Sequence, residues 1–469
     1  MFTEQPTLPG LPFLEKKASG SLDLPHGTAK AEREDNKLKL GDRAAHHWYR
    51  FVLSFPPHLV REYVAKFRLN SHHQVLDPFC GTGTTTVECQ KLGIPAFGLE
   101  PNPVACFASQ TKLQWNIAPQ KLLQHALRIA ETANRRLEQD GFFEDDAYRL
   151  FERPAGTKAK LRSLPDEVSD LLLANSISPI PLHKTLVLIE ALAENHDDHF
   201  SNHERLALAT ALVNGISNLQ FGPEVGVGPP KSDAPVVSLW LDGIRAMAQD
   251  LETLPKTKTV KTVVYQADAR YGASMLPANS VDAVITSPPY PNEKDYTRTT
   301  RLESVLLGFI QSKEALRSLK KQLVRSNTRG VYKADTDDLL VAGHPQIESI
   351  AAAIEKRRIE LNKDSGFERL YARVTKLYFG GMARHLAELR RVLRPGAQLA
   401  YVVGDQASYL RVMIRTGQLL AGIAESLGYE VVGLDLFRTR LSTATKEQLR
   451  EEVVILRWNG NRRAKKRGI

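Results

Sequence analysis

The sequence predicts an α/β protein built on an open sheet and interrupted by two long insertions. Three observations support this fold class. Short apolar runs with the composition of strands alternate along the chain with segments of helical period. Two long stretches break that alternation, one helical in its apolar pattern and the other partly basic. The chain has 469 residues, of which 42% are hydrophobic, so it can hold two or three modules of about 150 residues.

Seven segments are expected to form the strands. The first, residues 74–76, is an apolar run that ends at Asp77 and precedes a glycine-bearing turn and a helical stretch. The clearest of the helices spans 382–393 and is expected to end at Arg394-Pro395-Gly396, because proline and glycine stop helices. The other strands are expected at 96–100, 263–266, 281–286, 399–403, 429–436 and 452–458.

The first insertion covers residues 119–256 and is expected to be helical. Inside it, residues 221–231 contain so much glycine and proline that we expect a loop without regular structure. The second insertion covers residues 302–371 and contains a basic run at 317–333. The apolar periodicity that predicts the helices of the first insertion occurs at 122–137, 186–193, 206–216 and 236–251.

The two ends of the chain differ from the middle. Residues 1–45 are polar and punctuated by proline and glycine, so we expect a flexible arm. Residues 459–469 form a basic tail. No apolar run approaches the ~18 residues of a membrane helix, and the start lacks the pattern of a signal peptide. A cytoplasmic protein that does not enter a membrane is therefore expected.

The net charge of +10 favours a polyanionic partner, although charge alone is weak evidence for one. The three cysteines, Cys80, Cys89 and Cys106, cannot build a disulfide framework, and no CxxC pair suggests zinc. His46 and His47 are adjacent, and sequence neighbours rarely bind one ion together. No metal site is expected.

A glycine-bearing turn follows the first predicted strand and opens a helix. Gly81 and Gly83 would let the backbone approach a ligand closely, and Glu100 at the next strand end could accept hydrogen bonds from a ribose. A P-loop would place a lysine where this chain has Thr84 and Thr85. A dinucleotide site would have a third glycine, and Asp77 would repel a pyrophosphate. A cofactor with a sulfonium and an ammonium group fits better, because its positive charges attract carboxylates.

A second motif, Ser287-Pro288-Pro289-Tyr290, directly follows the apolar strand at 281–286. The exocyclic amines of bases are poor nucleophiles because their lone pair is delocalised into the ring. The hydroxyl of Ser287 and the carbonyl of Pro288 could accept both amine hydrogens and free that lone pair, and the prolines would hold the acceptors in place. Tyr290 offers a face on which an extruded base can stack.

Together these motifs resemble those of the DNA amino-methyltransferases, which methylate N4 of cytosine or N6 of adenine. The resemblance implies a Rossmann-like class I methyltransferase sheet, a catalytic domain made of residues 46–118, 257–301 and 372–458, and S-adenosyl-L-methionine as cofactor. It makes Ser287, Pro288, Pro289 and Tyr290 catalytic. The implied cofactor-binding residues are Asp77, Pro78, Phe79, Cys80, Gly81, Thr82, Gly83, Thr84, Thr85, Glu100 and Asp268. Residues 47–58 resemble the N-terminal element that covers the methionine end of the cofactor.

The resemblance also implies duplex DNA as substrate. Serine in first place of the second motif favours N4 of cytosine, and adenine stays open. Methylation of carbon 5 is disfavoured, because it needs a cysteine that follows a proline, and this chain has none. The second insertion is the candidate DNA-contacting region. The basic residues proposed to touch DNA are Lys294, Arg298, Lys320, Lys321, Arg325 and Arg329.

Other functions remain open at this point. The chain could be the protective half of a restriction-modification or phage-defence system, with a restriction or defence protein as partner. Transfer RNA guanine-N2 methyltransferases share a similar cofactor motif, usually with Asp-Pro-Pro-Tyr, and protein-glutamine methyltransferases favour Asn-Pro-Pro-Tyr. A subunit that only binds cofactor or DNA is a further alternative, but such a subunit should have lost one of the motifs, and both are intact.

Overall fold

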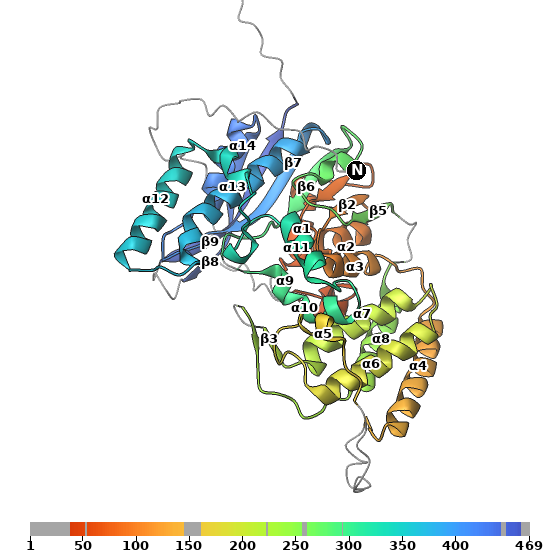
Figure 1. The fold of residues 1–469 in the computed structure, drawn as a ribbon. Helices are drawn as coiled ribbons and strands as arrows, with labels where there is room; N and C mark the ends of the chain where they lie inside the picture. The colour runs from red at the N-terminus through yellow and green to blue at the C-terminus, as the bar shows by residue number, and fades with distance from the viewer. Residues whose placement is uncertain are drawn as a thin grey trace, which may run out of the picture.

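The computed structural model describes residues 38–51, 54–144, 161–221, 224–255, 260–292, 294–441 and 447–460. Most of the expected N-terminal arm and nearly all of the expected basic tail lie outside the described residues. The described part consists of a central sheet with helices on both faces, and a mainly helical body that lies below it in the view of Figure 1.

A seven-stranded sheet has the order β5-β2-β1-β6-β7-β9-β8. The first five strands in this order are parallel, whereas β9 runs antiparallel to both β7 and β8. The Rossmann-like α/β class is therefore confirmed. The strands are β1 (Val75–Asp77), β2 (Ala96–Leu99), β5 (Thr262–Tyr265), β6 (Val281–Thr286), β7 (Leu393–Gly404), β8 (Glu430–Leu441) and β9 (Gln448–Trp458).

The order of the strands creates a switch point between β1 and β6. From β1 the chain proceeds outward to β2 and β5 on one side, and then returns to place β6 on the other side of β1. Crossover segments leave a crevice beyond the carboxyl ends of the strands at such a point, and open α/β sheets bind their ligands there. Both motifs of this chain follow these two strands.

Strand residues alternate between two apolar cores, one on each face of the sheet. On one face, Ala283 and Ile285 share a core with helix α1 (Pro57–Lys66) and with Cys89 of α2 (Thr84–Lys91). On the other face, Val284 packs in the core that holds α13 (Tyr371–Leu389) and α14 (Thr416–Ser426). Helix α3 (Pro103–Thr111) packs beside β5.

The helix expected at 382–393 is present as α13, but its expected end is wrong. The helix ends at Leu389, and Leu393 already pairs with Val281 as the first residue of β7. Pro395 and Gly396 therefore lie inside a strand, where the register between β6 and β7 shifts. Proline is tolerated there because an irregular ladder does not need its missing N–H.

The first insertion forms a helical body with its own apolar core. This core includes Trp240 and Ile244, both fully buried, and it continues into Trp48, Phe107 and Leu302. The body is therefore joined to α3 and to the segment after the Ser-Pro-Pro-Tyr loop. Its helices are α4 (Pro119–Gln139), α5 (Asp166–Ser169), α6 (Pro179–Glu194), α7 (Ser201–Ala211), a π-helical turn (Leu212–Ile216) and α8 (Val236–Thr253).

The loop expected at 221–231 is partly wrong, because its first half belongs to a hairpin. Strands β3 (Leu219–Phe221) and β4 (Val225–Val227) pair antiparallel, and Leu219 lies opposite Val227. Glycine weakens the interior of a strand. Gly226 is tolerated in β4 because this sheet has two strands and β4 pairs with β3 alone. Leu219 is buried in the helical core, which anchors the hairpin.

The second insertion runs from α10 to the start of α13. Its 3-10 turn Asp337–Val341 lies so close to α13 that a Cβ on Gly380 would come within 1.8 Å of the Asp337 carbonyl oxygen. Only glycine permits this contact. Figure 1 shows α12 beside α13. Its helices are α10 (Arg301–Leu306), α11 (Lys313–Gln322) and α12 (Pro345–Glu360), with further turns at Thr328–Gly330 and Glu368–Leu370. The short helix α9 (Tyr296–Thr299) precedes the insertion.

Candidate functional site

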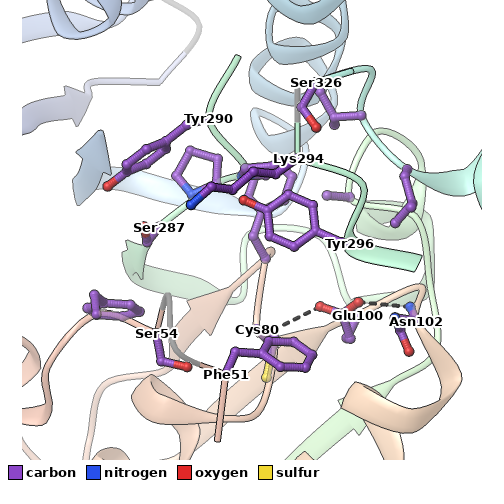
Figure 2. Close-up of a pocket in the computed structure, with 18 of the residues that line it drawn as sticks. Phe51, Ser54, Cys80, Glu100, Asn102, Ser287, Tyr290, Lys294, Tyr296 and Ser326 are labelled. Atoms are coloured by element: carbon purple, nitrogen blue, oxygen red, sulfur yellow. Dashed lines mark hydrogen bonds between the residues drawn. The ribbon is translucent and has the colours of Figure 1, made fainter. Parts of the chain in front are cut away.

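A pocket of about 370 Å³ lies beyond the carboxyl ends of the parallel strands. It contains residues of both sequence motifs, and Figure 2 shows Cys80 and Glu100 on one side of it and Ser287 and Tyr290 on the other. The predicted site residues that line it are Phe79, Cys80, Gly81, Thr82, Thr84, Glu100, Asp268, Ser287, Pro288, Pro289, Tyr290 and Lys294.

The glycine turn between β1 and α2 is built so that its backbone borders open space. Gly81 has φ +54°, and a Cβ added there would meet nothing within 4 Å. Gly83 has φ +88°, and its Cβ would lie 2.5 Å from Ser109 Oγ of α3. The first glycine therefore faces the pocket, and the second lets α3 pack closely. Thr82 lies between the two glycines. The buried Lys112 Nζ donates to its carbonyl at 2.9 Å and so fixes the turn.

Glu100, directly after β2, receives two backbone hydrogen bonds. Its Oε2 accepts from Gly81 N at 2.9 Å, and its Oε1 accepts from Asn102 N at 2.8 Å (Figure 2). Burial raises the pKa of Glu100 to about 7, and the two N–H donors oppose that rise. The carboxylate is thus held rigidly at the pocket wall, and it would gain from a further donor.

Asp77 is not among the described residues that line the pocket, and neither are Pro78, Gly83 and Thr85. Asp77 Oδ1 instead accepts from Thr286 Oγ1 at 2.6 Å and from Phe79 N at 3.1 Å. Burial raises its pKa to about 6. Thr85 Oγ1 donates to the Ile285 carbonyl at 3.1 Å. These two bonds tie the end of β1 and the start of α2 to the end of β6, so they hold the two motifs next to each other.

The Ser-Pro-Pro-Tyr loop leaves β6 and crosses the end of β7. The Ser287 hydroxyl donates to the Val402 carbonyl at 3.2 Å, so its oxygen keeps acceptor capacity. The ring of Tyr290 lies against Gly404, where a Cβ would come within 3.0 Å of it. Burial raises the pKa of the Tyr290 hydroxyl above its usual range, so this side chain stays neutral.

Asp268 lies in the pocket wall, but its carboxylate is engaged. Arg270 Nη2 donates to Asp268 Oδ2 at 2.7 Å, and Arg270 Nε donates to Oδ1 at 3.1 Å. The same guanidinium reaches Asp337 Oδ2 at 2.7 Å and the Lys321 carbonyl at 2.7 Å. Arg384 Nε pairs with the other oxygen of Asp337. Arg270 therefore connects the pocket wall at Asp268 with the second insertion.

Arg270 and the pocket wall that comes from the second insertion were not predicted from the sequence. Ser326 and Asn327 line the pocket together with Gln322, Leu323 and Val324. Nothing in the local sequence indicates that this segment turns back to β1 and β6. Tyr296, in the polar stretch directly after the Ser-Pro-Pro-Tyr motif, lines the pocket too. So does Asn102, and its position two residues after Glu100 was a signal that could have found it.

The N-terminal element at 47–58 divides between two environments. Phe51, Ser54 and Phe55 line the pocket, and Figure 2 places Phe51 opposite Tyr296. Trp48 and Tyr49 point instead into the helical core, where the Tyr49 hydroxyl donates to buried Glu303. Part of this element therefore covers the pocket, and the other part packs as core.

The six basic residues expected to touch DNA have different surroundings. Lys294 lines the pocket, and Arg298 is half-buried. Lys320 pairs with Asp295 at 3.2 Å. Arg325 is 3% exposed and bonds Asp335 and three backbone carbonyls, so its donors are engaged inside the protein. The exposed members of the set are Lys321, which lies over the ring of Tyr332, and Arg329, which lies over the ring of Phe367.

Across the described ranges of the chain, no three His, Cys, Asp or Glu side chains are grouped as metal ligands would be. None of the helices described there combines the length and the apolar character that a bilayer crossing requires.

Comparison with known proteins places the chain near Type II methyltransferases, although no family model matches it. It is similar to the Type II methyltransferase M.BsoBI of Geobacillus stearothermophilus, with 24% identity over 453 residues, which are 89% of this chain and 84% of the relative. The Type II methyltransferase M.AvaI of Anabaena variabilis is 24% identical over 414 residues, which are 82% of this chain and 79% of that protein. A shorter match, 34% identical over 93 residues, reaches M.MjaII of Methanocaldococcus jannaschii and covers 19% of this chain and 17% of that protein.

Proposed function

We propose that this chain transfers a methyl group from S-adenosyl-L-methionine to an exocyclic amine in duplex DNA, with N4 of cytosine favoured over N6 of adenine. The observation that carries the proposal is the single pocket shared by the glycine turn and the Ser-Pro-Pro-Tyr loop. Their strands pair in parallel, Val75 with Ala283, and the Asp77–Thr286 bond joins their ends. The similarity to Type II methyltransferases over most of the chain supports the same activity.

The cofactor side of the pocket fits S-adenosyl-L-methionine. Gly81 borders open space, so the backbone can come close to a ligand. Glu100 can accept hydrogen bonds from the ribose hydroxyls, which would relieve the cost of its burial. Phe79 and Phe51 add apolar walls. When bound, the cofactor supplies an electrophilic methyl group on a positively charged sulfur.

The other side of the pocket would prepare the amine. Ser287 Oγ and the Pro288 carbonyl accept its two hydrogens and keep the nitrogen lone pair out of conjugation with the ring. Tyr290 holds the extruded base by stacking. Its ring packs against Gly404, which limits where that base can lie. The freed lone pair would then face the electrophilic methyl group that bound S-adenosyl-L-methionine supplies, and the methylated amine would lose its extra proton to solvent. Positioning supplies most of the rate enhancement.

The two sides of the pocket belong to the catalytic domain that we propose for residues 46–118, 257–301 and 372–458. The second insertion, residues 302–371, is the proposed DNA-contacting region. Of the expected basic residues, we propose Lys321 and Arg329 of this insertion, with Lys294 and Arg298 just before it, as the DNA contacts. Lys320 and Arg325 are less suited, because Lys320 pairs with Asp295 and the donors of Arg325 are engaged by Asp335 and backbone carbonyls. We further propose a role in restriction-modification or defence, with a restriction or defence protein as partner.

The test is incubation with labelled S-adenosyl-L-methionine and, separately, duplex DNA, single-stranded DNA and transfer RNA, followed by nucleoside analysis. We expect label in duplex DNA as N4-methylcytosine. Tyr290→Ala should lose about 100-fold or more in turnover, because stacking of an extruded base contributes about 1–3 kcal/mol and also positions the amine. Tyr290→Phe keeps the ring and should stay close to wild type. Label that enters only RNA or protein would overturn the proposal.

A further inference from the structure

One wall of the pocket comes from neither motif. It is formed by the β8–β9 hairpin, which places Phe437, Arg438 and Glu451 in the lining. Arg438 Nε donates to Glu451 Oε2 at 2.6 Å, and Arg438 Nη2 donates to Oε1 at 3.0 Å. This bidentate pair sets the plane of the guanidinium. The side chain of Arg438 is 28% exposed, so a ligand in the pocket can reach it.

The hairpin wall lies beside the Ser-Pro-Pro-Tyr loop. Ser287 bonds the carbonyl of Val402, and two residues further along β7 Gly404 pairs with Glu451 of β9. A Cβ on Gly404 would lie 3.0 Å from the Tyr290 ring and 3.3 Å from Glu451 Cγ. Glu451 is therefore a close neighbour of the Tyr290 ring, and Arg438 is its cross-strand partner. The stacking ring and the ion pair border the same end of the pocket.

An arginine in this position suits one kind of ligand edge. Its guanidinium presents several N–H donors in a fixed plane and accepts nothing, so it matches an edge with adjacent acceptors. Next to its amine, cytosine presents acceptors at both N3 and O2. Adenine presents N1 next to its amine, followed by a C–H group that cannot accept. When the amine of a base lies at Ser287, the acceptor edge next to that amine would face the wall formed by the β8–β9 hairpin.

We propose that Arg438, held in place by Glu451, donates hydrogen bonds to N3 and O2 of the extruded base and thereby selects cytosine over adenine. The proposal rests on the proposed function, because it assumes that the amine of a base is methylated in this pocket. Arg438 is then a residue that contacts substrate, and Glu451 is a positioning residue. Phe437, which is buried beside them, supplies an apolar wall.

The experiment compares Arg438→Met with wild type on two duplexes. Both carry the site that wild-type enzyme methylates, one with cytosine and the other with 3-deazacytosine, which lacks the N3 acceptor. A hydrogen bond to a charged group corresponds to a change of about 10- to 100-fold in kcat/KM. Wild type should lose that factor on the analogue. Arg438→Met should lose more than that factor on cytosine, because it removes the bonds to both N3 and O2. It should no longer discriminate between the two duplexes, because the N3 contact is already absent from the variant.

A second arginine–carboxylate pair on the same hairpin gives the matched control. Arg450 Nη2 lies 2.8 Å from Glu452 Oε1, and Arg450 is not among the described residues that line the pocket. Arg450→Met removes an arginine–carboxylate pair from the same hairpin, within β9, and should leave the discrimination between the two duplexes unchanged. The dissociation constant for S-adenosyl-L-methionine, measured by calorimetry, should stay within about twofold of wild type in both variants, because neither arginine is assigned to the cofactor.

Four results would overturn this assignment. Equal loss by Arg438→Met on both duplexes, or equal loss of cofactor affinity and turnover, would show that the pair only supports the fold. A wild-type product of N6-methyladenine would reject the selection of cytosine, while methylation of a DNA amine would stand. Failure of wild type to label any DNA would reject the proposed function together with the inference.

Discussion

The two insertions are attached to the same sheet by different forces. The helical body is joined to the rest of the chain through an apolar core that contains Trp240, Ile244 and Phe107. The second insertion also buries apolar side chains, but its pocket-lining segment is fastened by ion pairs that centre on Arg270 and Asp337. Apolar contact is non-directional, whereas a bidentate pair fixes geometry. The first insertion therefore behaves as a scaffold, and the second supplies a positioned wall.

The largest expected effect comes from breaking the ion pairs of the second insertion. Arg270→Met would leave the half-buried Asp268 and the buried Asp337 without their shared partner, although Asp337 keeps Arg384. Removing one partner of a buried pair costs about 3–5 kcal/mol. We expect the free energy of unfolding in urea to fall by about that amount. Affinity for S-adenosyl-L-methionine should fall with it, because Asp268 and the segment of Ser326 both line the pocket.

Ile244→Ala is the matched change in the other insertion. Ile244 is fully buried in the helical core, and such a truncation costs about 2–5 kcal/mol. Its loss should lower stability in the same way and leave cofactor affinity, measured by calorimetry on folded protein, within about twofold of wild type. If both variants lost cofactor affinity equally, the distinction between scaffold and positioned wall would be wrong.

The second prediction concerns Glu100, which directly follows strand β2 and so belongs to neither insertion. Burial raises the pKa of Glu100 to about 7. The ionised carboxylate is the form that accepts hydrogen bonds from a ribose, so cofactor binding needs the state present above that pKa. Affinity should therefore fall as the pH drops through 7, approaching tenfold per pH unit, and level off above it. Calorimetry between about pH 6 and 8 measures this dependence.

Glu100→Gln is the control for this pH dependence. Glutamine keeps the shape and does not titrate, so its affinity should be lower at high pH and nearly constant with pH. Ile244→Ala should show the pH dependence of wild type, because the helical body does not reach Glu100. A wild-type profile that is flat across this range would show that Glu100 does not contact the ligand.

Sequence patterns located most of the sheet and both motifs because their signals are local. The turn at Gly81 and the Ser287 loop follow their strands directly, so the strand period and a few side chains were sufficient. Arg270 and the segment at Ser326 were missed because their roles depend on contacts between distant parts of the chain. Asp77 shows the intermediate case. Its place at a strand end was predicted, but only the structure shows that it bonds Thr286 at 2.6 Å, away from the pocket lining.

The smallest expected effect tests which insertion faces the phosphates. Arg329 of the second insertion and Arg128 of α4 are both exposed arginines, so they differ mainly in location. An arginine that neutralises one phosphate releases about one counterion, and its removal reduces the slope of log affinity against log salt by about 1. We expect Arg329→Ala to weaken duplex binding by about 0.5–1 kcal/mol with this change in slope, since a single exposed charge contributes little.

Arg128→Ala should leave both the affinity and the slope unchanged. Measuring both variants on duplexes of unrelated sequence as well as on the methylated site separates phosphate contact from base contact, because a phosphate contact weakens all duplexes alike. A larger loss of affinity and of slope in Arg128→Ala than in Arg329→Ala would indicate that DNA binds to the helical body. The scaffold would then also be a binding surface, and the directional pairs around Arg270 would serve the cofactor alone.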